Sequence, residues 1–169
     1  MQVDTRSIHE GLAQVQRYAR EFDRKVQRLR ERVAETIAWT ASSGFSNAVL
    51  DSVVGGSPRY ANVAVSVDNK GDITIVLADG EDAVWVEFGT GVYFNGAVGT
   101  SPHPNGSGLG FTIGTFGQGK GAQDVWGFYD AQTGELIKTH GAPAAMPMYR
   151  GVVQACEHLV EIAREVFKG

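Results

Sequence analysis

The sequence predicts an α+β protein in which a long N-terminal helix and a C-terminal helix accompany a small antiparallel sheet of about four to five strands. Three observations lead to this fold class. Apolar residues recur every three or four positions near both ends of the chain, they alternate with other residues in between, and eleven glycines crowd residues 89–121. A chain of 169 residues, 43% hydrophobic and 20% charged, fits a single globular domain over residues 1–169.

The first predicted element is a long amphipathic helix over residues 1–43. Its apolar positions are three or four residues apart, with an average spacing of about 3.5, and form a seam suited to packing against a neighbour or along a sheet. They are Ile8, Leu12, Val15, Ala19, Phe22, Val26, Leu29, Val33 and Ile37. Residues 42–44 are expected to end this helix, and residues 47–54 to form a short second one.

Four arginines follow the side of the first helix opposite the apolar seam. This basic stripe consists of Arg17, Arg20, Arg24 and Arg28. It is either a solvated face interleaved with acidic residues or a surface that faces phosphate. Residues 1–35 carry eight Lys/Arg and six Asp/Glu, a net charge of +2, whereas residues 36–169 carry seven and thirteen, a net charge of −6. Different surfaces are therefore expected to meet different environments.

A β-meander is predicted over residues 60–88, because large apolar residues alternate with smaller or polar ones there. The first strand contains Tyr60, Val63, Val65 and Val67, and the second contains Ile73, Ile75 and Leu77. Turns are expected at residues 68–71 and 79–82. The third strand covers residues 83–88, with Val84, Val86 and Phe88 on one face and Trp85 and Glu87 on the other.

A long glycine-rich loop over residues 89–124 follows the meander, and loops of this length in compact domains are usually functional. Residues 125–139 then predict a β-hairpin with a turn at 130–134. The C-terminal helix covers residues 147–168 and begins at Pro147, a position that tolerates proline. Its apolar stripe is Val152, Cys156, Leu159, Ala163 and Val166, so Cys156 is expected to pack in the core.

Motifs for catalysis, cofactors or metals are weak in this chain. The segment from Gly114 to Lys120 has the G-x-x-x-x-G-K spacing, but Gly121 stands where a phosphate-binding loop needs Ser or Thr. No strand-to-helix turn surrounds Ser107, and the histidines lack the spacing of metal ligands. Glu87 is expected to act at a subunit contact or as a hydrogen-bond acceptor for the loop rather than as a general acid. We therefore expect a non-enzymatic protein with no cofactor and no metal.

Two motifs give the chain a resemblance to a known family. Residues 83–91 read AVWVEFGTG and residues 140–147 read HGAPAAMP. In this order, between a long first helix and a last helix, they resemble the neck and tail-completion proteins of long-tailed bacteriophages, the head–tail joining or minor tail components of the lambda Z type. The resemblance covers nearly the whole chain. It departs from the family at residues 146–149, where a Pro-Phe-hydrophobic run is more usual, and in its longer glycine-rich loop.

The resemblance implies a single neck or tail-completion domain in a structural virion protein. Such a protein is assembled in the host cytoplasm into a homo-oligomeric ring at the head–tail junction. Its partners are the connector or head-completion proteins and the tail-terminator or tail-tube proteins, with no membrane involved. The ring lets genomic double-stranded DNA pass, so the basic stripe becomes a candidate for non-specific DNA contact.

A closed ring also requires two different complementary surfaces on each subunit. The seam of the first helix and the open sheet edges are candidates for these surfaces. The motif residues are further interface candidates: Glu87, Phe88, Gly89, Thr90, Gly91, His140, Gly141, Pro143 and Pro147. The glycine-rich loop is expected to order when it docks to a neighbouring ring. Its candidate contacts are Asn95, His103, Phe111, Phe116 and Lys120.

Two other functions remain open at this point. One is a nucleic-acid-binding module that uses the basic N-terminal helix, although the chain has a net charge of −4 and no aromatic residues interleaved on the basic face. The other is a different ring-forming tail component, such as a tail terminator.

Overall fold

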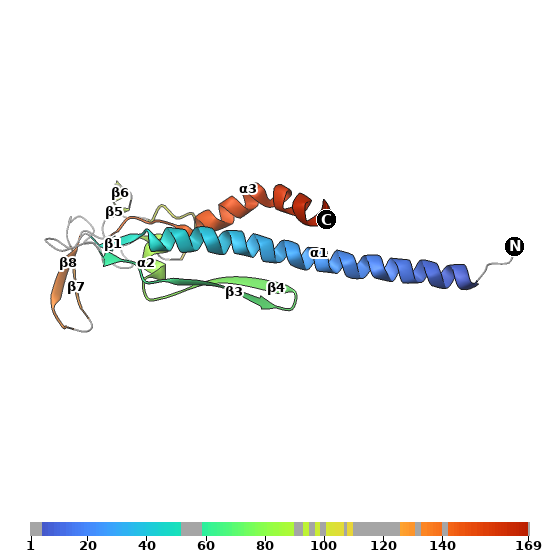
Figure 1. The fold of residues 1–169 in the computed structure, drawn as a ribbon. Helices are drawn as coiled ribbons and strands as arrows, with labels where there is room; N and C mark the ends of the chain where they lie inside the picture. Colours follow the sequence, from blue (N-terminus) through green and yellow to red (C-terminus); the bar gives the residue numbers. More distant parts are fainter. Residues whose placement is uncertain are drawn as a thin grey trace.

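A computed structural model describes residues 5–51, 59–89, 93–94, 97–98, 101–106, 108–109, 126–130, 133–139 and 142–168. It shows an α+β architecture around one long helix, α1 (Thr5–Ser46). A second long helix, α3 (Pro147–Lys168), runs antiparallel to α1 along one side, and a two-stranded hairpin lies along another side (Figure 1). The N-terminal part of α1 projects beyond both of them.

Several predicted positions lie outside the described residues. These are Thr90, Gly91, His140 and Gly141 of the two motifs, Asn95, Phe111, Phe116 and Lys120 of the loop, Ser107, and the segment from Gly114 to Gly121.

The long first helix is confirmed, but its predicted end at residues 42–44 is wrong, because α1 continues to Ser46. Gly44 serves close packing and does not end the helix. A Cβ atom at Gly44 would lie only 2.7 Å from the Cβ atom of Pro147 at the start of α3. The glycine therefore lets the two helices approach closely at this point.

The short helix expected after α1 is wrong in its described part. The chain instead forms β1 (Val49–Asp51), which pairs antiparallel with β2 (Arg59–Tyr60). Phe45 and Ala48, on either side of the end of α1, are both buried in the core. The backbone oxygen of Ala48 accepts the N–H of Ala61 at 3.2 Å, so pairing with the segment around β2 replaces helical hydrogen bonds here and outweighs local helix preference.

The first hairpin is confirmed as β3 (Ala64–Lys70) and β4 (Ile73–Asp79). Its turn is tighter than predicted, because Lys70 pairs with Ile73 and only Gly71 and Asp72 connect the strands. Gly71 has a φ of 58°, the left-handed conformation that such two-residue turns need. The strands therefore include residues that the sequence pattern assigned to a four-residue turn.

Residues 83–88, predicted as a third strand, form the short helix α2 (Ala83–Phe88) instead. The alternation of Val84 with Val86 indicated a strand. The buried residues, however, are Ala83, Val86 and Glu87, and this spacing of three and four is that of one helix face. Ala83 and Val86 join the main core, and this burial decides the conformation of a segment whose apolar pattern is ambiguous.

The glycine-rich stretch contains a small strand pair, β5 (Tyr93–Phe94) with β6 (Ala97–Val98). The second predicted hairpin is confirmed as β7 (Trp126–Tyr129) and β8 (Leu136–Thr139). Within the described ranges the strands form separate two-stranded sheets, β1–β2, β3–β4, β5–β6 and β7–β8. The expectation of one sheet with four to five strands is therefore wrong for this part of the chain.

The C-terminal helix is confirmed as α3, but most of its predicted apolar stripe does not face the protein. Its buried residues are Pro147, Gly151, Ala155, Ile162 and Val166. Small residues on this face allow close contact with α1, since a Cβ atom at Gly151 would lie 2.8 Å from the backbone oxygen of Ile37. Of the predicted stripe only Val166 is buried. Cys156 is exposed, so its predicted place in the core is wrong.

Candidate functional site

The basic stripe is exposed to solvent along α1. Arg17, Arg20, Arg24 and Arg28 are all exposed. The acidic residues near them pair elsewhere: Glu21 forms an ion pair with Lys25 at 3.3 Å, and Glu35 forms one with Arg32 at 3.6 Å. Among the described residues, none of the four guanidinium groups of the stripe has an ion-pair partner. The stripe can therefore meet an external polyanion without breaking internal ion pairs.

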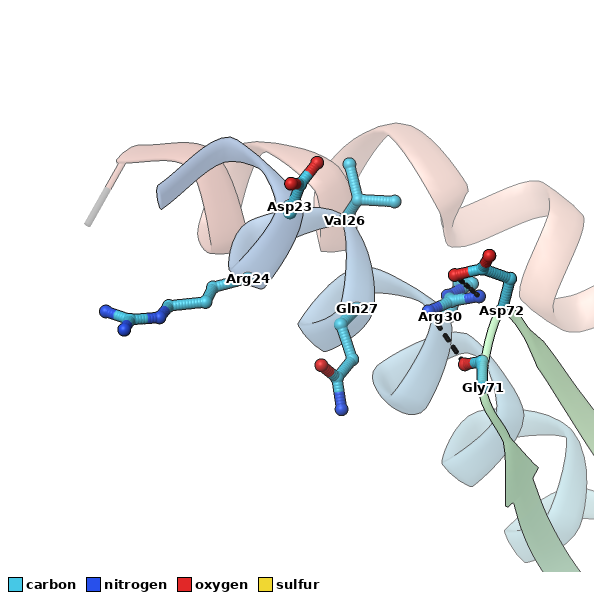
Figure 2. Close-up of a pocket in the computed structure, with 7 residues that line it drawn as sticks. All are labelled: Asp23, Arg24, Val26, Gln27, Arg30, Gly71 and Asp72. Carbon is cyan, nitrogen blue, oxygen red and sulfur yellow. Dashed lines mark hydrogen bonds and ion pairs between the residues drawn. The ribbon is translucent and has the colours of Figure 1, made fainter. Parts of the chain in front are cut away.

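A hollow of about 670 Å³ adjoins this stripe where the turn of the first hairpin meets α1. Its lining residues are Asp23, Arg24, Val26, Gln27, Arg30, Gly71 and Asp72. Figure 2 shows Arg30 turned toward the hairpin turn and Arg24 pointing away from it. Arg30 donates a hydrogen bond of 3.4 Å to the backbone oxygen of Gly71 and lies 3.9 Å from Asp72. Acidic and basic groups are balanced here, and Arg30 holds the hairpin tip against α1.

Glu87, a buried side chain of the first predicted motif, forms hydrogen bonds to two other segments of the chain. It lies near the end of α2, is only 7% exposed, and its carboxylate faces the first turn of α3. Oε2 accepts the backbone N–H of Met148 at 2.8 Å, and Oε1 accepts that of Tyr149 at 2.9 Å. A negative charge at these otherwise unpaired N–H groups stabilises the start of the helix. Glu87 is therefore a capping residue for α3, supplied from a distant segment.

His103 completes the same cluster. Its Nε2 lies 3.2 Å from Oε1 of Glu87, and its Nδ1 accepts the backbone N–H of Asn105 at 3.0 Å. The second contact leaves Nδ1 without a proton, so the neutral imidazole carries its proton on Nε2 and donates it to Glu87. The ring also packs at 4.5 Å between centroids against Phe88 and at 5.3 Å against Tyr149.

Ser101 fixes the turn that carries His103. Its Oγ donates a hydrogen bond of 2.6 Å to the backbone oxygen of Phe88 and accepts the N–H of His103 at 3.2 Å. Gly106 lies against this turn, since a Cβ atom there would be 2.8 Å from the Cβ atom of Ser101. Residues 101–106 of the glycine-rich stretch are thereby attached to α2 and α3.

The cluster of Glu87, Ser101 and His103 does not have the arrangement of a catalytic site. All three side chains are buried, and each of their polar atoms already has a partner among the described residues. A general base or nucleophile needs a free position toward its substrate, at hydrogen-bond distance. What this geometry can do is hold the two motif segments and the loop together.

The structure places the described parts of the two motifs side by side, although 48 residues separate the motifs in the sequence. The backbone N–H of Ala145 donates to the oxygen of Val86 at 2.9 Å. Gly89 ends α2 with a φ of 83° and donates to the oxygen of Trp85 at 2.8 Å. Pro147 is buried beside α1, whereas Pro143 is exposed. Most of the described motif residues therefore pack within one internal junction and do not form a separate exposed surface.

Sequence reasoning offered Glu87 as a hydrogen-bond acceptor for the loop, and His103 of the loop fills that place, but the donor was not identified. It also missed Ser101 and Asp82. Asp82 is 6% exposed, accepts a hydrogen bond of 2.9 Å from Arg59, and accepts the N–H of Asn62 at 3.1 Å. The available signal was an aspartate directly before an apolar segment, which is a frequent helix start. That signal would also have favoured the helix observed at residues 83–88.

The described residues contain no group of three or more His, Cys, Asp or Glu side chains suited to a metal ion. Likewise, none of the helices seen in the described ranges is long and apolar enough to cross a membrane. In comparisons with protein-family models, with curated proteins and with solved structures, nothing matches this chain.

Proposed function

We propose that this chain is a non-enzymatic structural protein of a tailed bacteriophage virion. It forms a homo-oligomeric ring at the head–tail junction, joins the connector to the tail, and lets DNA pass. The observation that carries this proposal is the amount of apolar surface that a single chain leaves exposed. Leu12 is 55% exposed, Tyr18 69% and Val160 59%, and they lie on two different long helices. Extended apolar surfaces of this kind mark sites of association.

The buried cluster around Glu87 supports the same proposal. It joins α2, α3 and the turn at residues 101–106 through hydrogen bonds to one buried carboxylate. A subunit of a closed ring presents two complementary surfaces in a fixed relation, and an internally bonded junction of this kind supports that relation. The motifs that resemble neck and tail-completion proteins thus supply the internal frame of the subunit.

The glycine-rich stretch between the two hairpins is proposed to dock to a neighbouring ring or to a connector protein. Of its five candidate contacts only His103 lies in the described part of the chain. Its side chain is 7% exposed and bonded to Glu87, so it positions the stretch instead of presenting a contact. The proposed docking residues are accordingly Asn95, Phe111, Phe116 and Lys120.

The basic stripe favours a second candidate, a nucleic-acid-binding module. The four exposed arginines of the stripe have no ion-pair partners among the described residues, which suits phosphate contact in either function. The ring is preferred because a free DNA-binding module leaves the exposed apolar surfaces without a role.

Oligomeric state and particle content test the proposal. Native mass spectrometry of the purified chain at rising concentration is expected to show a closed oligomer of defined size, and purified tailed particles are expected to contain the chain. Monomers at every concentration, together with particles that lack the chain, would refute the ring. Monomers that bind double-stranded DNA through the basic stripe would support the second candidate instead.

A further inference from the structure

The projecting part of α1 is an amphipathic helix whose apolar side is largely exposed among the described residues. We call residues 5–22 the α1 arm; in Figure 1 it extends past the ends of α3 and the first hairpin. Its large apolar side chains follow helical spacing on one side, and they are about half or more exposed: Ile8 55%, Leu12 55%, Val15 64%, Tyr18 69% and Phe22 46%. A lone helix of this kind needs a packing partner to bury its apolar side.

A second uncovered apolar surface runs along α3. The face that packs on α1 uses Ala155 and Ile162, and a different row of side chains points away from it. We call this row the outer α3 face; it consists of Tyr149, Val152, Val153, Leu159, Val160 and Phe167, which are 36–59% exposed. The exposed Cys156 lies at its middle. One helix thus carries two apolar faces. The described part of the chain packs on the first and contacts the second at its two ends, where Tyr149 meets His103 and Phe167 meets Phe22.

The arm and the outer α3 face match in length. At 1.5 Å per residue, residues 5–22 and residues 149–167 each span about 27–29 Å. Another exposed apolar row, on β4, consists of Ile73, Ile75 and Leu77. It is much shorter, because five residues of a strand span about 17 Å at most. Of these two surfaces, only the outer α3 face can cover the whole arm.

The buried area is also sufficient. An aromatic side chain alone spans about 150–250 Å², so the exposed apolar side chains of the two surfaces together offer on the order of 1,000 Å². Specific interfaces bury about 1,200–2,000 Å² in total, and the flanking polar groups of two packed helices add to the apolar part. Each subunit of a ring makes this contact twice, once with its arm and once with its α3.

A single chain cannot make this contact internally. α1 is one uninterrupted helix, and Phe22 at the base of the arm already contacts Phe167 at the end of α3, with 5.8 Å between ring centroids. Val15 lies seven residues beyond Phe22, and Cys156 lies eleven residues from Phe167 in the opposite direction. Along the antiparallel helices this places Val15 about 27 Å from Cys156 of the same chain.

We infer that the α1 arm of one copy packs along the outer α3 face of the next copy. This inference rests on the proposed ring and names the surfaces that close it. Because the arm and the face are different surfaces, each copy offers one free arm and one free face, and the contact repeats from copy to copy until the ring closes. The basic stripe follows the opposite side of α1 from Leu12 and Val15, so this contact leaves it exposed.

Disulfide trapping tests this contact directly, because Cys156 is the only cysteine of the chain. The middle of the arm is expected to lie near the middle of the outer α3 face, so Leu12→Cys or Val15→Cys should bond to Cys156 of a neighbour under mild oxidation. The expected result on a non-reducing gel is a ladder from dimer to full oligomer. Ala13→Cys, which lies on the other side of the arm, is the matched control and should give less than a tenth of that product.

The outcomes separate this inference from the proposed function. A closed oligomer in native mass spectrometry without links from Leu12→Cys or Val15→Cys would keep the ring and overturn the arm contact. Links that persist when Cys156→Ala is added would show arm-to-arm dimers and overturn it too. If the arm cysteine forms the ladder only with a cysteine introduced by Ile75→Cys on β4, and not with Cys156, the arm contacts the first hairpin of the neighbour instead. Monomers alone would overturn both proposals.

Discussion

Oε1 of Glu87 lies 3.2 Å from Nε2 of His103, and both side chains are buried. This pair links a short helix, a turn of the glycine-rich stretch and the first turn of α3. Glu87 also accepts two backbone N–H groups of α3, so one carboxylate serves three donors. Three hydrogen bonds at the junction of the two sequence motifs therefore converge on a single carboxylate.

Replacing Glu87 should destabilise the whole fold. In Glu87→Ala, two backbone N–H groups of α3 and the ring N–H of His103 lose their buried acceptor, and we expect the free energy of unfolding to fall by about 2–4 kcal/mol. Urea unfolding followed by circular dichroism measures the change. Glu81→Ala, at an exposed neighbouring position, is the control and should change stability little. Equal effects of the two variants would contradict the capping role.

The effects of Glu87 and His103 should be strongly coupled. His103→Ala removes the ring that donates to Glu87, and Glu87→Ala removes the acceptor, so the double variant breaks a contact that each single variant has already broken. The loss of stability in the double variant is therefore expected to be smaller than the sum of the single losses by about 0.5–3 kcal/mol. A double-mutant cycle in urea provides the measurement, and simple additivity would count against the pair.

Two glycines of α1 should respond in opposite ways to the same substitution. Gly44→Ala places a methyl group 2.7 Å from Cβ of Pro147, and overpacking of this kind costs about 1–3 kcal/mol. Gly11→Ala meets nothing within 4 Å, and the better helix propensity of alanine should stabilise the helix by up to about 1 kcal/mol. Thermal unfolding of both variants tests this. A stabilised Gly44→Ala variant would contradict the close approach of α1 and α3.

Charge reversal of the basic stripe should affect DNA passage but not folding. The triple variant combines Arg17→Glu, Arg24→Glu and Arg28→Glu. These residues are exposed and have no ion-pair partners among the described residues, so the unfolding temperature should stay nearly constant. Infectivity of particles assembled with the triple variant should fall at least tenfold. Reversal of three other exposed basic residues, Lys70, Lys138 and Arg164, controls for net charge. Unchanged infectivity of the stripe variant would rule out a DNA-facing role.

The elements with a regular hydrophobic period could be predicted from the sequence. The seam from Ile8 to Ile37 identified α1, and the second hairpin and α3 lie where the pattern placed them. Residues 83–88 could not be assigned in this way. Six mostly apolar residues fit a strand and a helix equally well, and the choice depends on the burial of Ala83 and Val86 against α1.

The sequence also does not reveal which face of a helix points inward when the helix has two apolar rows. In α3 the row with Val152 and Leu159 looked like the core face, but the face with Gly151 and Ala155 packs on α1 because small residues allow closer approach. For the site, Glu87 was recognisable as an acidic residue within an apolar segment. Its contacts with His103 and Tyr149 depend on segments 16 and 62 residues away, which no local pattern reveals.

Electron microscopy of tagged particles tests the central claim most directly. Under the proposed function, a small tag on this chain, detected with a gold-labelled binder in purified tailed particles, should place the label at the junction between head and tail. The same images of the purified chain should show rings with a central opening. Label on the capsid surface or at the distal tail, or complete particles without label, would contradict the account.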